Sequence, residues 1–309
     1  MPEATPRPRV VVVGDLVVDV VLAPATELQI GTDVTGRVML RQGGSATSTA
    51  RWLGRSGAHV SLIAAVGRDA AGRALVRTIR GDGVIPHIAR IAGRPTGRVG
   101  VLVAPDGERS FVQDRGAALH LAPEHMREEW FATVELVHIP TYSLLDHPLG
   151  DAGRLAAELA HAAGALVTVD LSSAGPLLAI GTAAAIEVVL GARPDLLFAA
   201  GTEARALAST DEELLDVAAI VVLKRGPEGA TILFREGTEV SRLDVAATAV
   251  DAADTTGAGD AFDAGFILGW LAARRDCASA AAGLQRAALA GHRLASRQLR
   301  RPREELSFD

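Results

Sequence analysis

Short apolar runs recur along the chain, and between them lie Ala- and Leu-rich stretches with the composition of helices. Apolar, β-branched runs of this kind, bounded by turn residues, are typical of buried strands. Strands that alternate with helices predict an α/β fold with a largely parallel sheet. The predicted strands are residues 10–13, 59–66, 135–139, 165–170, 195–198 and 220–224, and the predicted helices are residues 46–55, 70–80, 151–163, 202–208, 258–273 and 277–297.

Two segments break this rhythm. Residues 16–40 and 98–113 alternate apolar and polar positions, and the second carries a Pro-Asp-Gly turn at 105–107 between two extended runs. Such a turn predicts a hairpin. We therefore expect a small β-sheet flap over the ends of the main strands, where open α/β sheets bind ligands. No fixed-period repeat or linker divides the chain, so residues 1–309 are expected to form a single domain.

The composition argues against several classes of partner. The formal net charge is -6 and no basic run is interleaved with aromatics, so nucleic acid is not expected to bind. The single cysteine, Cys277, cannot form an intrachain disulfide, and no Cys/His cluster has the spacing of a zinc site. Asp15 and Asp19 interrupt the apolar run near the N-terminus, which fits neither a signal peptide nor a membrane span. We expect a cytoplasmic protein with no membrane partner.

The segment with the most chemical content is DTTGAGDAFDAGF, residues 254–266, where a glycine-rich turn leads into an Ala-rich helical stretch. Backbone amides of such a turn, together with the helix N-terminus, form a site for phosphate oxygens. Asp260 falls in the first helical turn, where a carboxylate can accept the proton of an alcohol that attacks phosphorus. The alternative is that Asp260 only caps or complements the helix.

The complete string resembles the second signature of the ribokinase/PfkB family of carbohydrate kinases. The resemblance implies that Asp260 is the catalytic base and that the turn before it is the anion hole. Residues 43–57, GGSATSTARWLGRSG, resemble the first signature of this family, in which the paired glycines approach the sugar. Ser48 stands where the family usually has Asn, but the chain contains no asparagine at all, which weakens the departure as evidence. The anion-hole positions are Gly257, Ala258 and Gly259, and the paired glycines are Gly43 and Gly44.

The opening VVVVGDLVVDVV resembles the first strand of the family, and residues 95–111 resemble its lid hairpin. By this resemblance Asp19 matches the carboxylate that binds sugar hydroxyls. Asp15 is either a helper in that role or a polar position of a strand pair. Arg115, just after the lid segment, either reaches an acidic group on the sugar or is an ordinary surface residue.

Two further segments resemble the nucleotide and metal side of the family site. In FAAGTEARAL, residues 198–207, Glu203 matches the glutamate of an NxxE motif beside Mg²⁺, while Ala200 stands in place of its Asn; Glu203 is otherwise an exposed residue at a helix start. In VVLKRGPEGA, Lys224 is the only lysine of the chain and either meets phosphate or ends a strand in solvent. The resemblance also implies nucleotide contacts for Gly226 and Gly229 and, as in several family members, a monovalent-cation site such as a K⁺ site at Asp254 and Thr256.

Taken together, the resemblance implies a ribokinase-like three-layer αβα sandwich with a mainly parallel central sheet and a small β-sheet lid. The implied reaction is ATP-dependent phosphorylation of a hydroxyl on a small sugar or sugar acid, with Mg²⁺. One alternative is a nucleoside kinase of the same fold, although aromatic residues make up only 4% of the chain. Another is a non-catalytic sugar- or nucleotide-binding regulator, while an NAD dehydrogenase would need a GxGxxG motif that is missing. Lid strands of this type often pair between subunits, which makes a homodimer a further expectation.

Overall fold

The computed structural model describes residues 7–104, 108–248, 250, 252, 254–276, 279–301 and 303–308. Its larger sheet has nine strands in the order β13-β12-β11-β10-β9-β8-β1-β4-β5. From β11 to β5 all neighbours are parallel, and β12 and β13 add two antiparallel strands at one edge. The strands are β1 (Arg9–Val13), β4 (His59–Gly67), β5 (Val84–Ile91), β8 (Leu136–Pro140), β9 (Leu166–Asp170), β10 (Leu196–Ala200), β11 (Ile220–Lys224), β12 (Ala230–Glu236) and β13 (Glu239–Val245).

Helices cover both faces of this sheet, and each face has its own apolar core. The side chains of Val10 and Val12 face one core, whereas those of Val11 and Val13 face the other, because successive strand residues point to opposite faces. The predicted three-layer αβα architecture is therefore confirmed. The first core takes residues of α1 (Ser45–Arg55), α2 (Ala70–Gly81), α8 (Ala258–Arg275) and α9 (Ala280–Leu299), and the second takes residues of α3 (Tyr142–Leu145), α4 (Leu149–Ala162), α5 (Ala174–Ile180), α6 (Thr182–Ala192) and α7 (Gly201–Leu207).

The six predicted strands and six predicted helices all lie within an observed element or overlap one closely. For the last helix the observed start is Ala280, and Cys277, where the prediction began, lies outside the described residues. The prediction missed β5, β12 and β13 and the short helices α3, α5 and α6. Among the described residues, five 3-10 segments occupy Ala117–His120, Pro123–His125, Glu128–Trp130, Glu212–Asp216 and Gly226–Glu228.

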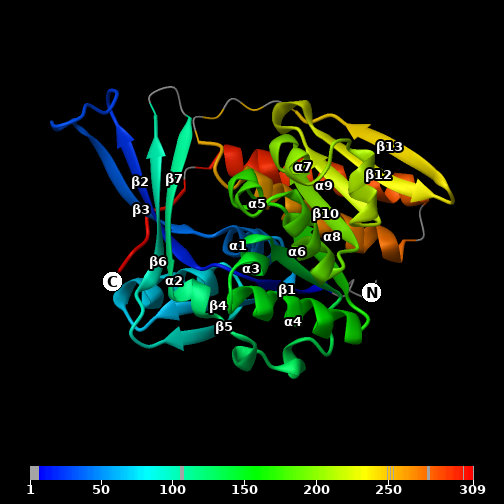
Figure 1. Cartoon of the computed structure of the whole chain (residues 1–309), viewed down its shortest axis with the longest axis horizontal. Helices are drawn as coiled ribbons and strands as arrows, with labels where there is room; N and C mark the ends of the chain where they lie inside the picture. The colour runs from blue at the N-terminus through cyan, green and yellow to red at the C-terminus, as the bar shows by residue number, and fades with distance from the viewer. Residues whose placement is uncertain are drawn as a thin grey trace, which may run out of the picture.

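The second sheet has four strands in the order β3-β2-β6-β7 and forms the lid, a name used here for β2 (Val17–Pro24), β3 (Gly36–Gly43), β6 (Thr96–Val103) and β7 (Arg109–Gly116). It stands at one end of the molecule and rises away from the larger sheet (Figure 1). Both alternating segments predicted as a flap contribute strands to this sheet. The predicted turn at 105–107 lies outside the described residues. The strands on either side of it, β6 and β7, pair antiparallel. The C-terminal tail, residues 303–308, reaches the lid, where the Leu306 amide donates to the Leu40 carbonyl at 2.7 Å.

The described helices were also compared with the requirements of a membrane span. No single one is long and apolar enough to cross a bilayer, while α5 and α6 meet the length and composition requirement only as a pair bent by 112°.

Candidate active site

The predicted site residues meet at the carboxyl edge of the larger sheet. Strands β9, β10 and β11 end side by side there, in a register that pairs Phe198 with Asp170 and Ala200 with Lys224. A cavity of about 450 Å³ lies between this edge and the lid. Its lining includes Asp19 from the lid, Lys224 from the sheet edge and Asp260 from α8. The topology therefore places the strand ends and the lid around one cavity, as open parallel sheets do.

The glycine-rich turn leads into α8 as the sequence indicates. Gly257 is the N-cap with φ 77°, a backbone conformation that favours glycine, and the helix begins at Ala258. As a glycine, Gly257 has no side chain that could cap this N-terminus. Asp260 lies in the first turn of α8, as an acidic residue that complements the helix would, and its carboxylate also accepts a hydrogen bond from Ser45 Oγ at 2.7 Å.

Asp260 is half-buried on the wall of the cavity. Loss of hydration in this position raises the pKa of its carboxyl to about 7, against the hydrogen bond from Ser45, which lowers it. A group with a pKa near neutrality can be ionised before a reaction and protonated after it. This is what a general base at neutral pH requires. Ser45 was not predicted as a site residue.

Lys224 belongs to a buried ion cluster. Its Nζ lies 2.8 Å from Asp170 Oδ1 and 3.1 Å from Asp263 Oδ2. Burial alone would lower the pKa of Lys224, but the two carboxylates outweigh it and raise this pKa above its usual value. The alternative that Lys224 ends a strand in solvent is wrong. Neither Asp170 nor Asp263 was predicted, because only the fold brings them to Lys224.

Glu203 is buried, with 8% of its surface exposed, so the alternative of an exposed helix-start glutamate is wrong. Its Oε2 accepts a hydrogen bond from the Ala200 amide at 2.6 Å. Burial and the neighbouring carboxylate of Asp170 raise the pKa of Glu203. Both carboxylates line the cavity, and their mutual repulsion favours a cation between them and a bound ligand.

These residues fit a hydrated Mg²⁺. No group of three or more His, Cys, Asp or Glu side chains suited to a metal occurs within the described ranges. Mg²⁺ does not need one, because it is usually held by one or two carboxylates, substrate phosphates and retained waters. Glu203 and Asp170 would hold it here.

The sugar side of the cavity is built around Asp19, on lid strand β2. A Cβ at Gly43 would lie 1.9 Å from Asp19 Oδ1, so the first glycine of the pair is required by this close approach. Arg303 Nη1 donates to Asp19 Oδ2 at 2.9 Å. Burial nevertheless raises the pKa of Asp19. Gly44 and Ser48 line the same cavity, where the sequence placed them.

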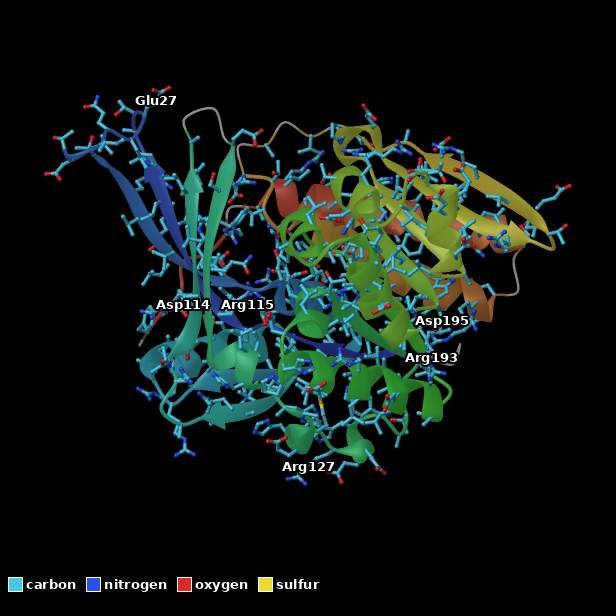
Figure 2. The ribbon with its side chains drawn as sticks, in the orientation of Figure 1. Glu27, Asp114, Arg115, Arg127, Arg193 and Asp195 are labelled. Carbon is cyan, nitrogen blue, oxygen red and sulfur yellow. The ribbon has the colours of Figure 1, made fainter. Side chains whose placement is uncertain are left out.

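Arg115 is buried, with 8% of its surface exposed, at the base of β7, next to the exposed Asp114 (Figure 2). Its Nε and Nη2 both bind Asp15, each at 2.8 Å, and Nη1 binds Asp146 at 3.0 Å. Ordinary surface use of Arg115 is therefore wrong. Because two carboxylates already hold its guanidinium, Arg115 anchors Asp15, which follows β1 and lines the cavity.

A second, largely apolar cavity of about 280 Å³ adjoins the first. The two share Lys224, Gly226 and Gly259, so a ligand can extend from one into the other. Its size and lining suit a flat heteroaromatic group. Gly226 and Gly229 were predicted here, but no sequence signal pointed to the apolar walls, which include Ala247, Val250, Phe262, Ala295 and Leu299.

Asp254 and Thr256 lie together at the start of the glycine-rich turn, where the Thr256 amide donates to Asp254 Oδ1 at 2.9 Å. Protein donors already surround both predicted cation ligands, since arginines pair with Asp254 and Gln298 donates to the Thr256 carbonyl. Burial raises the pKa of Asp254, but the hydrogen bonds from Thr256 and the charges of Arg303 and Arg109 outweigh it and hold this pKa below its usual value. These residues do not fit a K⁺ site.

The chain is similar in sequence and in fold to known kinases. The sequence pattern of the pfkB family carbohydrate kinase matches residues 7–304. Over 235 residues the chain is 32% identical to an ATP-dependent ribose-1-phosphate kinase of Halopiger xanaduensis, covering 74% of this chain and 73% of that protein. Adenosine kinase from Sinorhizobium meliloti superposes with a TM-score of 0.81 at 26% identity, over 98% of both chains. An Escherichia coli protein solved with ATP and Mg²⁺ superposes with a TM-score of 0.77 at 22% identity, over 98% of this chain and 96% of that one.

Proposed function

Because the chain belongs to the pfkB family of carbohydrate kinases, we propose that it transfers the γ-phosphoryl group of ATP to a hydroxyl of a small sugar or sugar acid. The observation that carries the proposal is the position of Asp260, a carboxylate with a pKa of about 7 on the wall of a cavity that is continuous with an apolar one. The hydroxyl proton passes to Asp260, the oxygen forms a bond to the γ-phosphorus, and ADP leaves. ATP-dependent transfer is also the activity named for the Halopiger relative.

The nucleotide half of the site follows from the shape of the two cavities. Adenine enters the apolar cavity beside Gly226 and Gly229, and the phosphates extend toward the turn at 257–259. Amides at this turn and the α8 N-terminus favour negative charge there. Lys224, fixed by two carboxylates, adds a positive charge between the cavities. Mg²⁺, held by Glu203 and Asp170, would neutralise phosphate charge, and the E. coli protein of the same fold, solved with ATP and Mg²⁺, supports the use of this ion.

The sugar half lies under the lid. Asp19 and Ser48 bind hydroxyls of the acceptor, and Gly43 and Gly44 let its ring approach the start of α1. This places the acceptor hydroxyl between the lid and Asp260. Catalysis here relies on alignment of the acceptor hydroxyl with the γ-phosphoryl group and on stabilisation of the phosphate charge, as is general for phosphoryl transfer.

A nucleoside is a second candidate for the acceptor. Phe111 of β7 and Tyr142 of α3 both line the main cavity, and aromatic rings there can stack on a base. Similarity to an adenosine kinase adds support. The two proposals differ in whether the part of the acceptor beside Phe111 and Tyr142 is a nucleoside base or not.

The remaining parts of the proposal concern the whole protein. Residues 1–309 act as a single kinase domain with the lid over its site, in the cytoplasm and without nucleic acid or membrane partners. A homodimer through the lid is supported by apolar side chains that the lid exposes, with Val38 at 68%, Phe111 at 54% and Val112 at 77% exposure. Size-exclusion chromatography with light scattering tests it.

An ADP-release screen tests the function. Purified protein is incubated with Mg·ATP and a panel of pentoses, hexoses, sugar acids, sugar phosphates and nucleosides, each with and without EDTA. We expect turnover with at least one sugar and its loss in EDTA. Turnover confined to nucleosides favours the second candidate. Undiminished turnover in EDTA contradicts the Mg²⁺ assignment, and the absence of turnover with every acceptor contradicts the kinase proposal.

A further inference from the structure

Three arginines surround the carboxylate that begins the glycine-rich turn. Arg41 Nη1 lies 3.0 Å from Asp254 Oδ2, and Arg109 Nη2 lies 3.0 Å from Oδ1. Arg303 Nε is 3.5 Å from Oδ2. The Thr256 amide and Arg41 Nη1 donate hydrogen bonds to this carboxylate, while Arg109 and Arg303 contact it as ion pairs. Three guanidinium groups therefore supply the positive charge that a monovalent cation would bring to Asp254.

These arginines come from three separate parts of the chain. Arg41 is on lid strand β3, Arg109 is on lid strand β7, and Arg303 is in the C-terminal tail. Their side chains are largely withdrawn from solvent, with 11%, 13% and 15% exposure. Arg109 also donates to Thr255 Oγ1 at 2.9 Å, so it contacts two successive residues of the turn. The turn is therefore held from the lid and from the tail at the same time.

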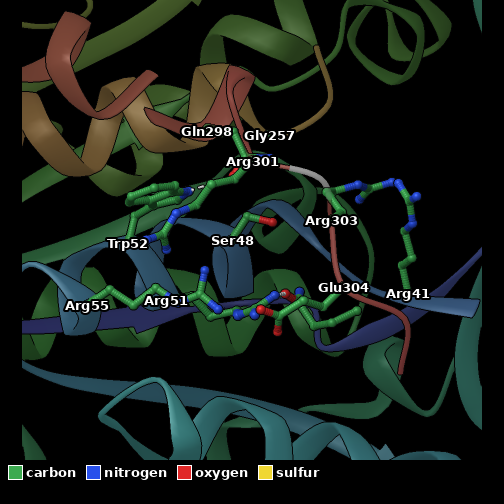
Figure 3. Close-up of a pocket in the computed structure, with 11 residues that line it drawn as sticks. Arg41, Ser48, Arg51, Trp52, Arg55, Gly257, Gln298, Arg301, Arg303 and Glu304 are labelled. Carbon is green, nitrogen blue, oxygen red and sulfur yellow. Dashed lines mark hydrogen bonds between the residues drawn. The ribbon is translucent and has the colours of Figure 1, made fainter. Parts of the chain in front are cut away.

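The other predicted cation ligand, the Thr256 carbonyl, has a donor as well. Gln298 Nε2 donates to it at 2.9 Å, and Gln298 Oε1 accepts from Trp52 Nε1 at 3.0 Å (Figure 3). This second bond fixes the amide orientation, because Trp52 can only donate. A side-chain amide thus binds the carbonyl that a cation would need.

The charge around this carbonyl also disfavours a cation. Gly257, next in the turn, lines a cavity of about 60 Å³. Figure 3 shows guanidinium groups on several sides of it. Glu304 is the only carboxylate of its lining, against the five arginines Arg41, Arg51, Arg55, Arg301 and Arg303. Arg51 and Arg55 share Asp82, and Arg41 and Arg303 pair with Asp254, so Arg301 adds the net positive charge that a K⁺ ion would meet on this side.

We propose that guanidinium groups take the place of a monovalent cation in this enzyme, so that it needs no K⁺. Arg303 is the main positioning residue. It pairs with Asp254 and also donates to Asp19, so one side chain connects the sugar-binding carboxylate to the turn that receives phosphate. The activity part of this inference rests on the proposed function, whereas its binding and melting parts do not.

The first test uses the full-length protein in tetramethylammonium chloride and in KCl at equal ionic strength. An ion that binds the folded protein raises its melting temperature by mass action. We expect equal Tm, equal Kd for ATP and equal turnover in the two salts. A higher Tm, tighter ATP binding or activation in KCl would overturn the proposal. If no acceptor is turned over in either salt, the proposed function fails, and Tm and the Kd for ATP still decide the cation question.

The second test removes the guanidinium while retaining apolar bulk. We expect Arg303→Met to lower kcat/KM by about 10- to 100-fold in tetramethylammonium, because the turn loses its alignment, and KCl to restore much of that loss. The matched control is Arg300→Met, three residues away, since Arg300 is exposed and lines neither the cavity beside Gly257 nor the main cavity. Full activity of Arg303→Met in both salts, or an equal defect in both, would overturn the positioning role. A control variant that also gains K⁺ dependence would do so as well.

Discussion

The two ends of the main cavity treat their carboxylates differently. At the sugar end, Asp15 accepts two hydrogen bonds from one edge of the Arg115 guanidinium, and Asp19 is paired with Arg303. At the catalytic end, the hydrogen bond to Asp260 comes from a neutral hydroxyl. All of these side chains line one cavity. The carboxylates at its two ends therefore differ in their hydrogen-bond partners, not in whether they reach the cavity.

This difference separates positioning from proton transfer. A guanidinium beside a carboxylate favours the ionised form and fixes its orientation, which suits a group that must only bind and align. A general base must instead bind a proton near the working pH. Burial raises the pKa of Asp19 as well, but Arg303 opposes that rise, whereas Asp260 has only the Ser45 hydroxyl as partner and its pKa is raised to about 7, as that task requires.

The largest effect is expected for Asp260→Asn, which removes the base but keeps its size. Losing a general base typically costs about 10²- to 10⁴-fold in rate. We expect kcat to fall by that factor while the Kd for ATP is retained. Steady-state kinetics and calorimetric titration with ATP measure the two quantities. Near-normal turnover would make Asp260 a structural residue.

The same variant has a stability signature. Because the folded pKa of Asp260 is raised, its contribution to stability is complete below the unfolded value of about 3.9 and is lost as the pH rises through about 7. Asp260→Asn lacks this loss, so it should melt above the wild type at pH 8, by a margin that shrinks at pH 5. Asp114→Asn, at an exposed lid position, is the control and should show no such pH-dependent margin.

The second prediction compares a buried ion cluster with an exposed pair. Lys224→Met leaves Asp170 and Asp263 buried without their cation, and removal of one partner of a buried pair costs about 3–5 kcal/mol. Arg98→Met breaks only the exposed pair with Asp114, which should cost less than about 1 kcal/mol. Urea unfolding of both variants measures the difference. Equal free energies of unfolding would mean that the Lys224 cluster contributes nothing beyond a surface pair.

The sequence predicted the centre of the fold better than its edges. Strands β1 and β11 are continuous apolar runs because helices bury both of their faces, and such runs are visible without a structure. Strand β5 is an edge strand that carries Pro86, and the edge strand β13 mixes charged and polar residues with apolar ones. Proline and charge at a sheet edge are tolerated there but weaken the strand signal.

The same limit holds for the site. Asp19 and Asp260 lie in motifs of adjacent residues, so a sequence can indicate them. Arg303 is 284 residues from Asp19, its partner, and no local pattern connects the two. Asp170 ends a strand and Asp263 lies within a helix, and only the parallel topology brings them to Lys224. Local motifs therefore indicated the reacting residues, while the fold determined which charged side chains pair with them.

The third prediction tests the control of the Asp260 pKa. In the wild-type protein, kcat/KM should fall about tenfold per pH unit below pH 7, because Asp260 becomes protonated and can no longer act as the base. Ser45 lowers this pKa through its hydrogen bond, so Ser45→Ala should move the acid limb to higher pH while turnover on the alkaline plateau changes little. The pH dependence of kcat/KM in both proteins measures the shift. A limb that stays in place in Ser45→Ala would contradict the assignment of the limb to Asp260.

The smallest effect is expected at Ser48, on the sugar side of the comparison. Ser48 lines the cavity from α1, and its short hydroxyl makes fewer hydrogen bonds than an amide would. Ser48→Asn should add a bond to an acceptor hydroxyl worth about 0.5–1.5 kcal/mol, which lowers KM about two- to tenfold. Because Asp260 and Ser45 are untouched, the acid limb of the pH profile should not move. Steady-state kinetics with the acceptor found in the ADP-release screen measure both quantities. An unchanged KM would remove Ser48 from the sugar site, and a shifted limb would mean that the binding and catalytic ends are not independent.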